Sequence, residues 1–349
     1  VSALPSYVPG ARDGGGPESI KLSSNENPFQ PLPSVREAID KAAASVNRYP
    51  DMFSRELTEA LAERYDLPEG AVAVGAGSVS VLGHALQAFC APQDEVVYAW
   101  RSFEAYPILS RLTGATAVEV PLAAEGRHDL VAMARAVTER TKVVLLCSPN
   151  NPTGPAIRET EFEAFMGEVP SGVLVILDEA YVEFVRDPLV VDGRKALTRH
   201  PNLVIARTFS KAYGLAGLRV GFALGEPDVM SAIRACVTPF SLSGIAQAAA
   251  LASLEVEGEL FERVDAIVAE RERTLKALRG QRWNLPEAQG NFFWFEAKDE
   301  ASAFAAYLRT ATPPLLVRPF DGEGVRINVG STGENDHLIA TLEAYPSRF

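Results

Sequence analysis

Residues 173–181 read VLVILDEAY, so a run of aliphatic side chains ends at the acid Asp178. A near-continuous apolar run of this length is typical of a β-strand that is buried on both faces, as in parallel sheets covered by helices. Because stretches with helical spacing separate it from similar runs, the sequence predicts an α/β fold with a mostly parallel, doubly wound, seven-stranded sheet. The other six runs are residues 71–75, 95–99, 115–120, 142–147, 202–207 and 219–224.

The first two parts of the chain differ in how often proline and glycine interrupt them. Residues 1–30 are interrupted by prolines and glycines and are predicted to form an irregular N-terminal arm. Residues 31–250 are predicted to form a large domain. It would begin with amphipathic helices at 33–46 and 54–65, the second with Ser54 at its N-cap.

A smaller α+β domain is predicted at residues 251–349. A long helical pattern from 243 to about 279, with an expected break at Gly258, leads into it. Its remaining elements would be apolar strands and a closing helix from about Asn335, with the strands at residues 291–296, 315–320 and 325–330.

The composition narrows the classes of function. The 349 residues include 45 acidic and 33 basic side chains, for a net charge of −12, which argues against nucleic acid as the main ligand. No apolar run reaches the roughly 18 residues that cross a bilayer, and the first residues lack the basic and apolar regions of a secretory signal. Three distant cysteines and four histidines without metal-ligand spacing predict no metal site and a cytoplasmic location.

Ligands of open α/β sheets bind beyond the carboxyl ends of the strands, so the polar residues at those positions are the first candidates for a site. Lys211 is the only one of seven lysines that follows a buried strand, in the Ser-rich turn Arg-Thr-Phe-Ser-Lys. A nucleophilic lysine at such a place can form a Schiff base if its pKa is lowered, although most loop lysines are simply solvated. The polar residues that follow the strands are Ser78, Ser80, 101–104, 148–153, 178–181 and 208–211.

Other residues at the strand ends favour a nucleophilic role for Lys211 over that of a solvated loop lysine. Asp178, at a buried strand end, needs a cationic partner, and a protonated pyridine nitrogen would supply one. Asn151 could donate its amide N–H to a phenolate oxygen, although an Asn-Pro turn is also ordinary loop structure. Arg219 suits a phosphate, and residues 77–79 lie between a strand and a helix, where an anion is favoured.

Three motifs together resemble the fold-type I aminotransferases that depend on pyridoxal 5′-phosphate (PLP). The likeness to the histidinol-phosphate aminotransferase branch extends over nearly the whole chain, through LSSNENPF (22–29), NRYPD (47–51) and VRINVG (325–330). Within that branch the chain is most similar to the aromatic amino acid (phenylalanine) aminotransferases of actinobacterial type, through GSVS (77–80) and WRSFEAYP (100–107). The three motifs are SPNNPTG (148–154), DEAY (178–181) and TFSKAYGLAGLRVG (208–221).

The resemblance implies a role for each matching residue. Lys211 would hold PLP as a Schiff base, Asp178 would pair with the ring nitrogen, and Asn151 and Tyr181 would bind the ring 3-oxygen. Phe103 and Ala180 would cover the two faces of the ring. The phosphate would be bound by Gly77, Ser78, Val79, Thr208, Ser210 and Arg219.

The resemblance also implies that the large domain, residues 31–250, binds PLP and that the arm, residues 1–30, packs with the small domain or a dimer partner. It further implies a homodimer and a substrate site. Tyr49 would reach the cofactor of the partner subunit, and Asn25, Arg318 and Arg326 would bind the substrate. Without the resemblance, Tyr49 and Phe103 could as well be core aromatic residues, and the two arginines could be members of surface ion pairs.

The activity implied is transamination of phenylalanine, tyrosine and tryptophan with 2-oxoglutarate. Histidinol phosphate is the alternative donor: one arginine suits a carboxylate and two suit a phosphate dianion. Because both Arg318 and Arg326 are present, the count of arginines leaves the donor open. A PLP-dependent β-lyase and a non-catalytic PLP-binding regulator are further alternatives. Two departures from the histidinol-phosphate pattern are Gly-Ser-Val-Ser at 77–80, where Gly-Ala-Asp-Glu is frequent, and Phe103, where Tyr is frequent.

Overall fold

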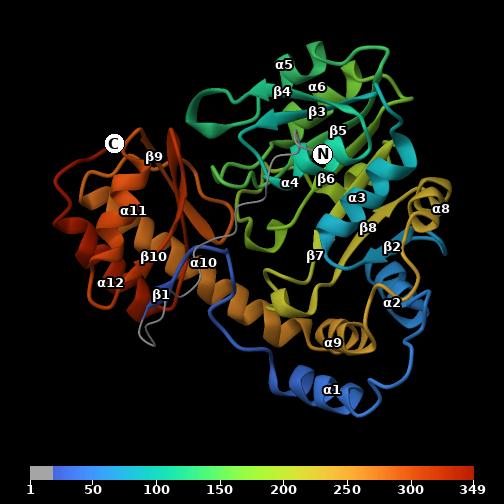
Figure 1. Ribbon diagram of the computed structural model, residues 1–349, viewed down its shortest axis with the longest axis horizontal. Coiled ribbons are helices and arrows are strands. Elements are labelled where there is room, and N and C mark those ends of the chain that lie inside the picture. The colour runs from blue at the N-terminus through green and yellow to red at the C-terminus, as the bar shows by residue number, and fades with distance from the viewer. Residues whose placement is uncertain (1–18) are drawn as a thin grey trace.

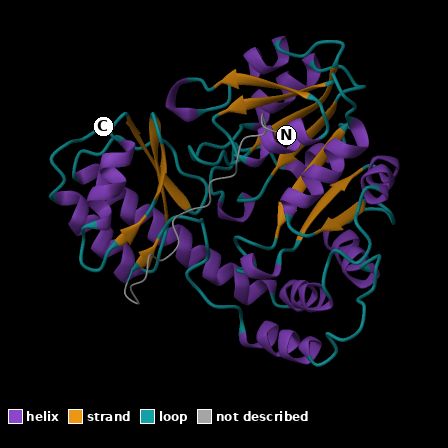
Figure 2. Ribbon diagram, in the orientation of Figure 1, coloured by secondary structure: helices purple, strands orange, loops and turns teal. Residues whose placement is uncertain are grey.

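The computed structural model describes residues 19–349, and a seven-stranded sheet forms the centre of its larger part (Figures 1 and 2). The strand order is β2-β8-β7-β6-β5-β3-β4, and β8 runs antiparallel to both of its neighbours. The predicted α/β class and the mostly parallel sheet are therefore confirmed. The strands are β2 (Val72–Gly75), β3 (Glu95–Trp100), β4 (Thr116–Pro121), β5 (Thr141–Cys147), β6 (Leu174–Asp178), β7 (Leu203–Thr208) and β8 (Gly221–Gly225).

Both faces of this sheet are buried. Successive side chains of a strand point to opposite faces, and in β6 Val175 joins one apolar cluster while Ile176 joins the other. One cluster includes residues of α3, α4 and α8, and the other includes residues of α2, α5, α6, α7 and α9. These helices are α1 (Pro33–Ala43), α2 (Arg55–Tyr65), α3 (Ser78–Phe89), α4 (Ala105–Leu112), α5 (Leu130–Arg135), α6 (Glu159–Glu168), α7 (Gly193–Leu197), α8 (Pro227–Ala235) and α9 (Gly244–Glu255), with short 3-10 turns η1 (Ala124–Gly126), η2 (Val182–Phe184) and η3 (Ala216–Leu218).

The C-terminal part is a separate group of strands and helices, coloured orange to red in Figure 1. A three-stranded antiparallel sheet has the order β11-β12-β9, and β10 pairs in parallel with β1 (Ile20–Lys21) from the start of the chain. Residues 20–21 of the predicted arm thus lie against this part, while residues 1–18 of the arm lie outside the described residues. The elements are α10 (Glu257–Gly280), β9 (Phe292–Lys298), α11 (Ala301–Arg309), β10 (Leu315–Leu316), β11 (Arg318–Phe320), β12 (Glu323–Asn328) and α12 (Thr332–Glu343).

One local prediction was confirmed in position only, and one was wrong. Ser54 occupies the N-cap position of α2, but its backbone is left-handed and its side chain makes no capping bond. Instead, the Asp51 carboxylate accepts from the backbone N–H of Arg55 at 2.8 Å. The break between α9 and α10 is at Val256, where φ is −115°, and the predicted breaking residue Gly258 lies inside α10.

No helix within residues 19–349 is long and apolar enough to span a bilayer. Over the same range, no group of three or more His, Cys, Asp and Glu side chains is arranged to hold a metal ion.

Candidate active site

A cavity of about 810 Å³ lies at the carboxyl ends of the central strands. It brings together fourteen of the predicted site residues, which come from every part of the chain. They are Asn25, Ser78, Val79, Phe103, Asn151, Asp178, Ala180, Tyr181, Thr208, Ser210, Lys211, Arg219, Arg318 and Arg326. Gly77 directly precedes the lining residue Ser78, and Tyr49 lies elsewhere.

Lys211 follows β7 and extends its amine into this cavity. Its Nζ donates hydrogen bonds to the carbonyl oxygens of Ser24 and Asn25, at 3.1 and 3.2 Å. Burial lowers the pKa of Lys211 to about 7, and the positive charges of Arg326 and Arg219 add to this effect. A lysine in this environment is an available nucleophile and base at neutral pH.

Asp178 ends β6 in the middle of the sheet, between Cys147 of β5 and Ala206 of β7. The residue is 3% exposed. Its Oδ2 accepts a 2.8 Å hydrogen bond from the Tyr106 hydroxyl, whereas its buried Oδ1 has no hydrogen-bond partner among the described residues. Burial raises the pKa of Asp178 to about 6. A buried carboxylate oxygen without a partner calls for a ligand that donates a proton or carries positive charge.

Two further donors converge from Asn151 and Tyr181. Asn151 accepts a hydrogen bond at Oδ1 from Arg326, an orientation that presents its Nδ2 hydrogens to a ligand acceptor. The Tyr181 hydroxyl accepts from Asn25 at 3.0 Å, so its own hydrogen is available for donation. Burial raises the pKa of Tyr181, which keeps the phenol protonated. Both groups suit a ligand oxygen that bears negative charge.

At the opposite end of the cavity, backbone and side-chain donors lie close enough together to bind one anion. The N-terminus of α3 begins at Ser78, and Arg219 crosses directly over Gly77: a Cβ on Gly77 would lie 2.5 Å from Nη2 of Arg219. A Cβ on Gly221 would lie 2.1 Å from the backbone nitrogen of Ser78. Because only glycine fits at both positions, backbone N–H groups, the helix N-terminus and a guanidinium meet at one point.

Phe103 and Ala180 both line the cavity, and the Phe103 ring lies edge-on to Tyr106 with centroids 5.8 Å apart. Tyr49 is different, since it is 83% exposed and its ring lies 4.7 Å from that of Phe240. The structure therefore does not bring Tyr49 to the cavity of its own chain, and a role in a partner subunit remains a prediction.

Comparison with known proteins places these features in a family. The family model for class I and class II aminotransferases matches residues 17–342. The chain belongs to this family.

Named relatives cover nearly the full length of this aminotransferase. It is 53% identical to the aromatic amino acid aminotransferase of Thermobifida fusca, over 100% of this chain and 96% of that protein. It is 50% identical to the enzyme of the same name from Streptomyces coelicolor, over 99% and 96%. Among solved structures, histidinol-phosphate aminotransferase of Sinorhizobium meliloti in complex with PLP matches with a TM-score of 0.86 and 30% identity, over 93% of this chain and 89% of that one. The fold is that of the fold-type I enzymes.

Class I and II aminotransferases use PLP, and the cavity of this aminotransferase fits that cofactor. Oδ1 of Asp178 offers a buried acceptor for a protonated ring nitrogen, and Lys211 offers an amine with a lowered pKa for the aldehyde. The glycine-bounded cradle at Arg219 offers donors for the phosphate.

Sequence reasoning missed two contacts of the aminotransferase site. Tyr106 positions Asp178, but the sequence pointed to it only as a member of the motif WRSFEAYP (100–107) and gave it no role. Glu104 was among the polar residues that follow a strand, yet its partner Arg318 lies 214 residues further along the chain. Only the tertiary fold brings them together.

Proposed function

We propose that this aminotransferase transfers the α-amino group of phenylalanine, tyrosine and tryptophan to 2-oxoglutarate, giving aromatic 2-oxo acids and L-glutamate. The observation that carries the chemistry is the presence of Lys211 and Asp178 in one cavity, where burial lowers the pKa of the lysine and raises the pKa of the acid. Relatives that are 50–53% identical over 96% of their length and named for aromatic amino acids support the choice of donor.

PLP, when bound, supplies an electron sink for the negative charge that develops at the substrate Cα. Asp178 would hold the proton of the ring nitrogen through Oδ1. Lys211, after release by the incoming amine, would accept the proton from the substrate Cα, and its pKa of about 7 leaves about half of the amine uncharged at neutral pH.

The remaining residues bind and orient. Asn151 and Tyr181 would donate to the ring 3-oxygen, and Phe103 and Ala180 would confine the ring between them. Ser78, Val79, Thr208, Ser210 and Arg219 would hold the phosphate, with Gly77 allowing the close approach. This anchoring would fix the ring so that Lys211 meets one face of the substrate Cα.

Arg326 is the proposed partner of the substrate carboxylate. It is 9% exposed, and it is held by Asn151 and by the backbone oxygen of Ser23 at 2.8 Å. Asn25 and Arg318 line the same end of the cavity. Ile108 and Leu109 add apolar surface that suits an aromatic side chain.

We further propose that the enzyme is a cytoplasmic homodimer. The exposed rings of Tyr49 and Phe240 lie 4.7 Å apart, and Val46 and Phe53, which are close to Tyr49 in the sequence, are also exposed; exposed apolar side chains of this kind favour an interface. Tyr49 would extend from it into the partner's cavity. The three cysteines are free, which supports a reducing compartment.

A panel of amino donors tests the proposal. The purified holoenzyme is assayed with phenylalanine, tyrosine, tryptophan and histidinol phosphate, each with 2-oxoglutarate as acceptor. We expect the highest kcat/KM with the aromatic amino acids. A marked preference for histidinol phosphate would support the alternative donor, and release of ammonia and pyruvate from cystine-like substrates without an acceptor would indicate a β-lyase.

A further inference from the structure

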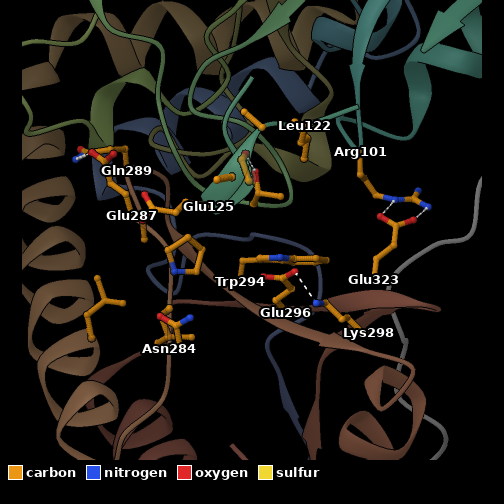
Figure 3. A pocket seen from close by; sticks show the side chains of 18 of the residues that line it. Arg101, Leu122, Glu125, Asn284, Glu287, Gln289, Trp294, Glu296, Lys298 and Glu323 are labelled. Atoms are coloured by element: carbon orange, nitrogen blue, oxygen red, sulfur yellow. Dashed lines mark hydrogen bonds and ion pairs between the residues drawn. The ribbon is translucent and has the colours of Figure 1, made fainter. Parts of the chain in front are cut away.

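Two ion pairs join the loop after β3 to the β11–β12 hairpin. Nη2 of Arg318 donates to both carboxylate oxygens of Glu104, at 2.9 Å each. The neighbouring pair is Arg101 with Glu323, which Figure 3 shows reaching toward each other across a different cavity of about 1080 Å³. Glu104 and Arg318 line the substrate cavity, whereas Arg101 and Glu323 do not.

The Glu104 pair changes the charge at the anion-binding end of the cavity. Arg318 and Arg326 are directly opposite each other in the β11–β12 register, so their like charges are held close together. The side chains of Arg318 and Glu104 are only 8% and 21% exposed, which limits solvent screening of the pair. With Glu104 present, the three groups carry a net charge of +1, where the two arginines alone would carry +2.

Two other cationic side chains that line the cavity have contacts of their own. Lys21 also lines it, but its amine pairs with Glu26 at 2.8 Å. Arg219 contacts Ser210 and crosses Gly77 at the proposed phosphate end of the cofactor. Among the described residues, Glu104 is therefore the acid that pairs with an arginine at this end of the cavity.

We propose that Glu104 determines specificity by making this end of the cavity select donors whose reacting carbon bears a carboxylate over donors that bear a phosphate ester there. A carboxylate carries one negative charge and matches a net +1. A phosphate ester carries about −1.5 to −2 at pH 7, and the Glu104 carboxylate would repel it. The inference rests on the proposed function and deepens it, because the number of arginines alone leaves the donor open.

The test compares kcat/KM for phenylalanine and histidinol phosphate in holoenzymes. In Glu104→Gln we expect the ratio to shift toward histidinol phosphate by about tenfold or more, mainly through KM, as one charge-assisted contact is gained for the phosphate. Glu323→Gln breaks the neighbouring pair without altering the substrate cavity, and its ratio should stay within about twofold of the wild type. The double variant E104Q/R318Q returns the cluster to +1 and should regain the wild-type preference.

Each outcome decides the matter. An unchanged ratio in Glu104→Gln, an equal shift in Glu323→Gln, or no restoration in the double variant would overturn the proposal. If Glu104→Gln gives no folded holoenzyme, Glu104→Ala provides the same +2 cluster and carries the same expectation. Wild-type enzyme that does not act on phenylalanine at all would contradict the proposed function instead, so the two failures are distinguishable.

Discussion

The Tyr106 hydroxyl donates a 2.8 Å hydrogen bond to Oδ2 of Asp178, while Oδ1 of that carboxylate has no hydrogen-bond partner within residues 19–349. Tyr106 is fully buried in the first turn of α4, whose N-cap is Glu104. One helix therefore positions the acid that is proposed to hold the cofactor's ring nitrogen.

Replacing Tyr106 should alter how cofactor affinity depends on pH. The hydroxyl lowers the pKa of Asp178 against the larger raising effect of burial, so in Tyr106→Phe that pKa rises above about 6. Since the carboxylate form is the one that pairs with a protonated ring nitrogen, PLP affinity should fall by up to about tenfold near pH 6 and little at pH 8.5.

Titration of the stripped enzyme with PLP at both pH values measures this effect. Tyr98→Phe is the matched control, because it removes a buried hydroxyl that contacts Glu119 instead of Asp178. A loss of affinity that is the same at both pH values, or the same in the control, would contradict a role through Asp178.

Asp178 should destabilise the cofactor-free protein at high pH. Its folded-state pKa, about 6, is above the ordinary value of 3.8. Its favourable contribution to the free energy of unfolding is therefore fully present below pH 3.8 and is lost as the pH rises through 6. Asp178→Asn should therefore increase the free energy of unfolding of the apoprotein by about 2 kcal/mol at pH 8 and by much less at pH 4.5, while abolishing most turnover. Chemical denaturation at the two pH values checks it; equal stability of variant and wild type at pH 8 would refute the argument.

The glycine cradle makes a steric prediction. A Cβ at Gly221 would lie 2.1 Å from the backbone nitrogen of Ser78, so Gly221→Ala should displace the start of α3, reduce stability by about 2 kcal/mol or more, and weaken PLP binding. Gly217→Ala lies in the same segment and meets no atom within 4 Å, so it should leave both quantities unchanged. Unfolding and PLP titration of the two variants provide the comparison, and similar behaviour of both would contradict the close approach.

The local pattern of the sequence predicted the seven central strands, because apolar runs that are buried on both faces have a distinct signature. It could not predict that β8 runs antiparallel to its neighbours, since its run resembles those of the parallel strands. Strand order was equally hidden, because pairing joins segments that are distant in the chain.

The site was predicted to the extent that its residues follow strands. Asp178 ends an apolar run, Asn151 and Lys211 each follow one within a short turn, and parallel strands bring their carboxyl ends to one edge. Contacts that cross between distant elements could not be anticipated. The pairing of Glu104 with Arg318 and the support of Asp178 by Tyr106 depend on side-chain packing that no spacing in the sequence encodes.

Reduction of the PLP-loaded enzyme with borohydride, followed by peptide mass mapping, tests the central claim most directly, because it fixes the cofactor to the amine that holds it. The account predicts a single phosphopyridoxyl group on the peptide that contains Lys211, and none in Lys211→Arg. Labelling of the other lysine that lines the cavity, Lys21, or no labelling at all, would contradict it.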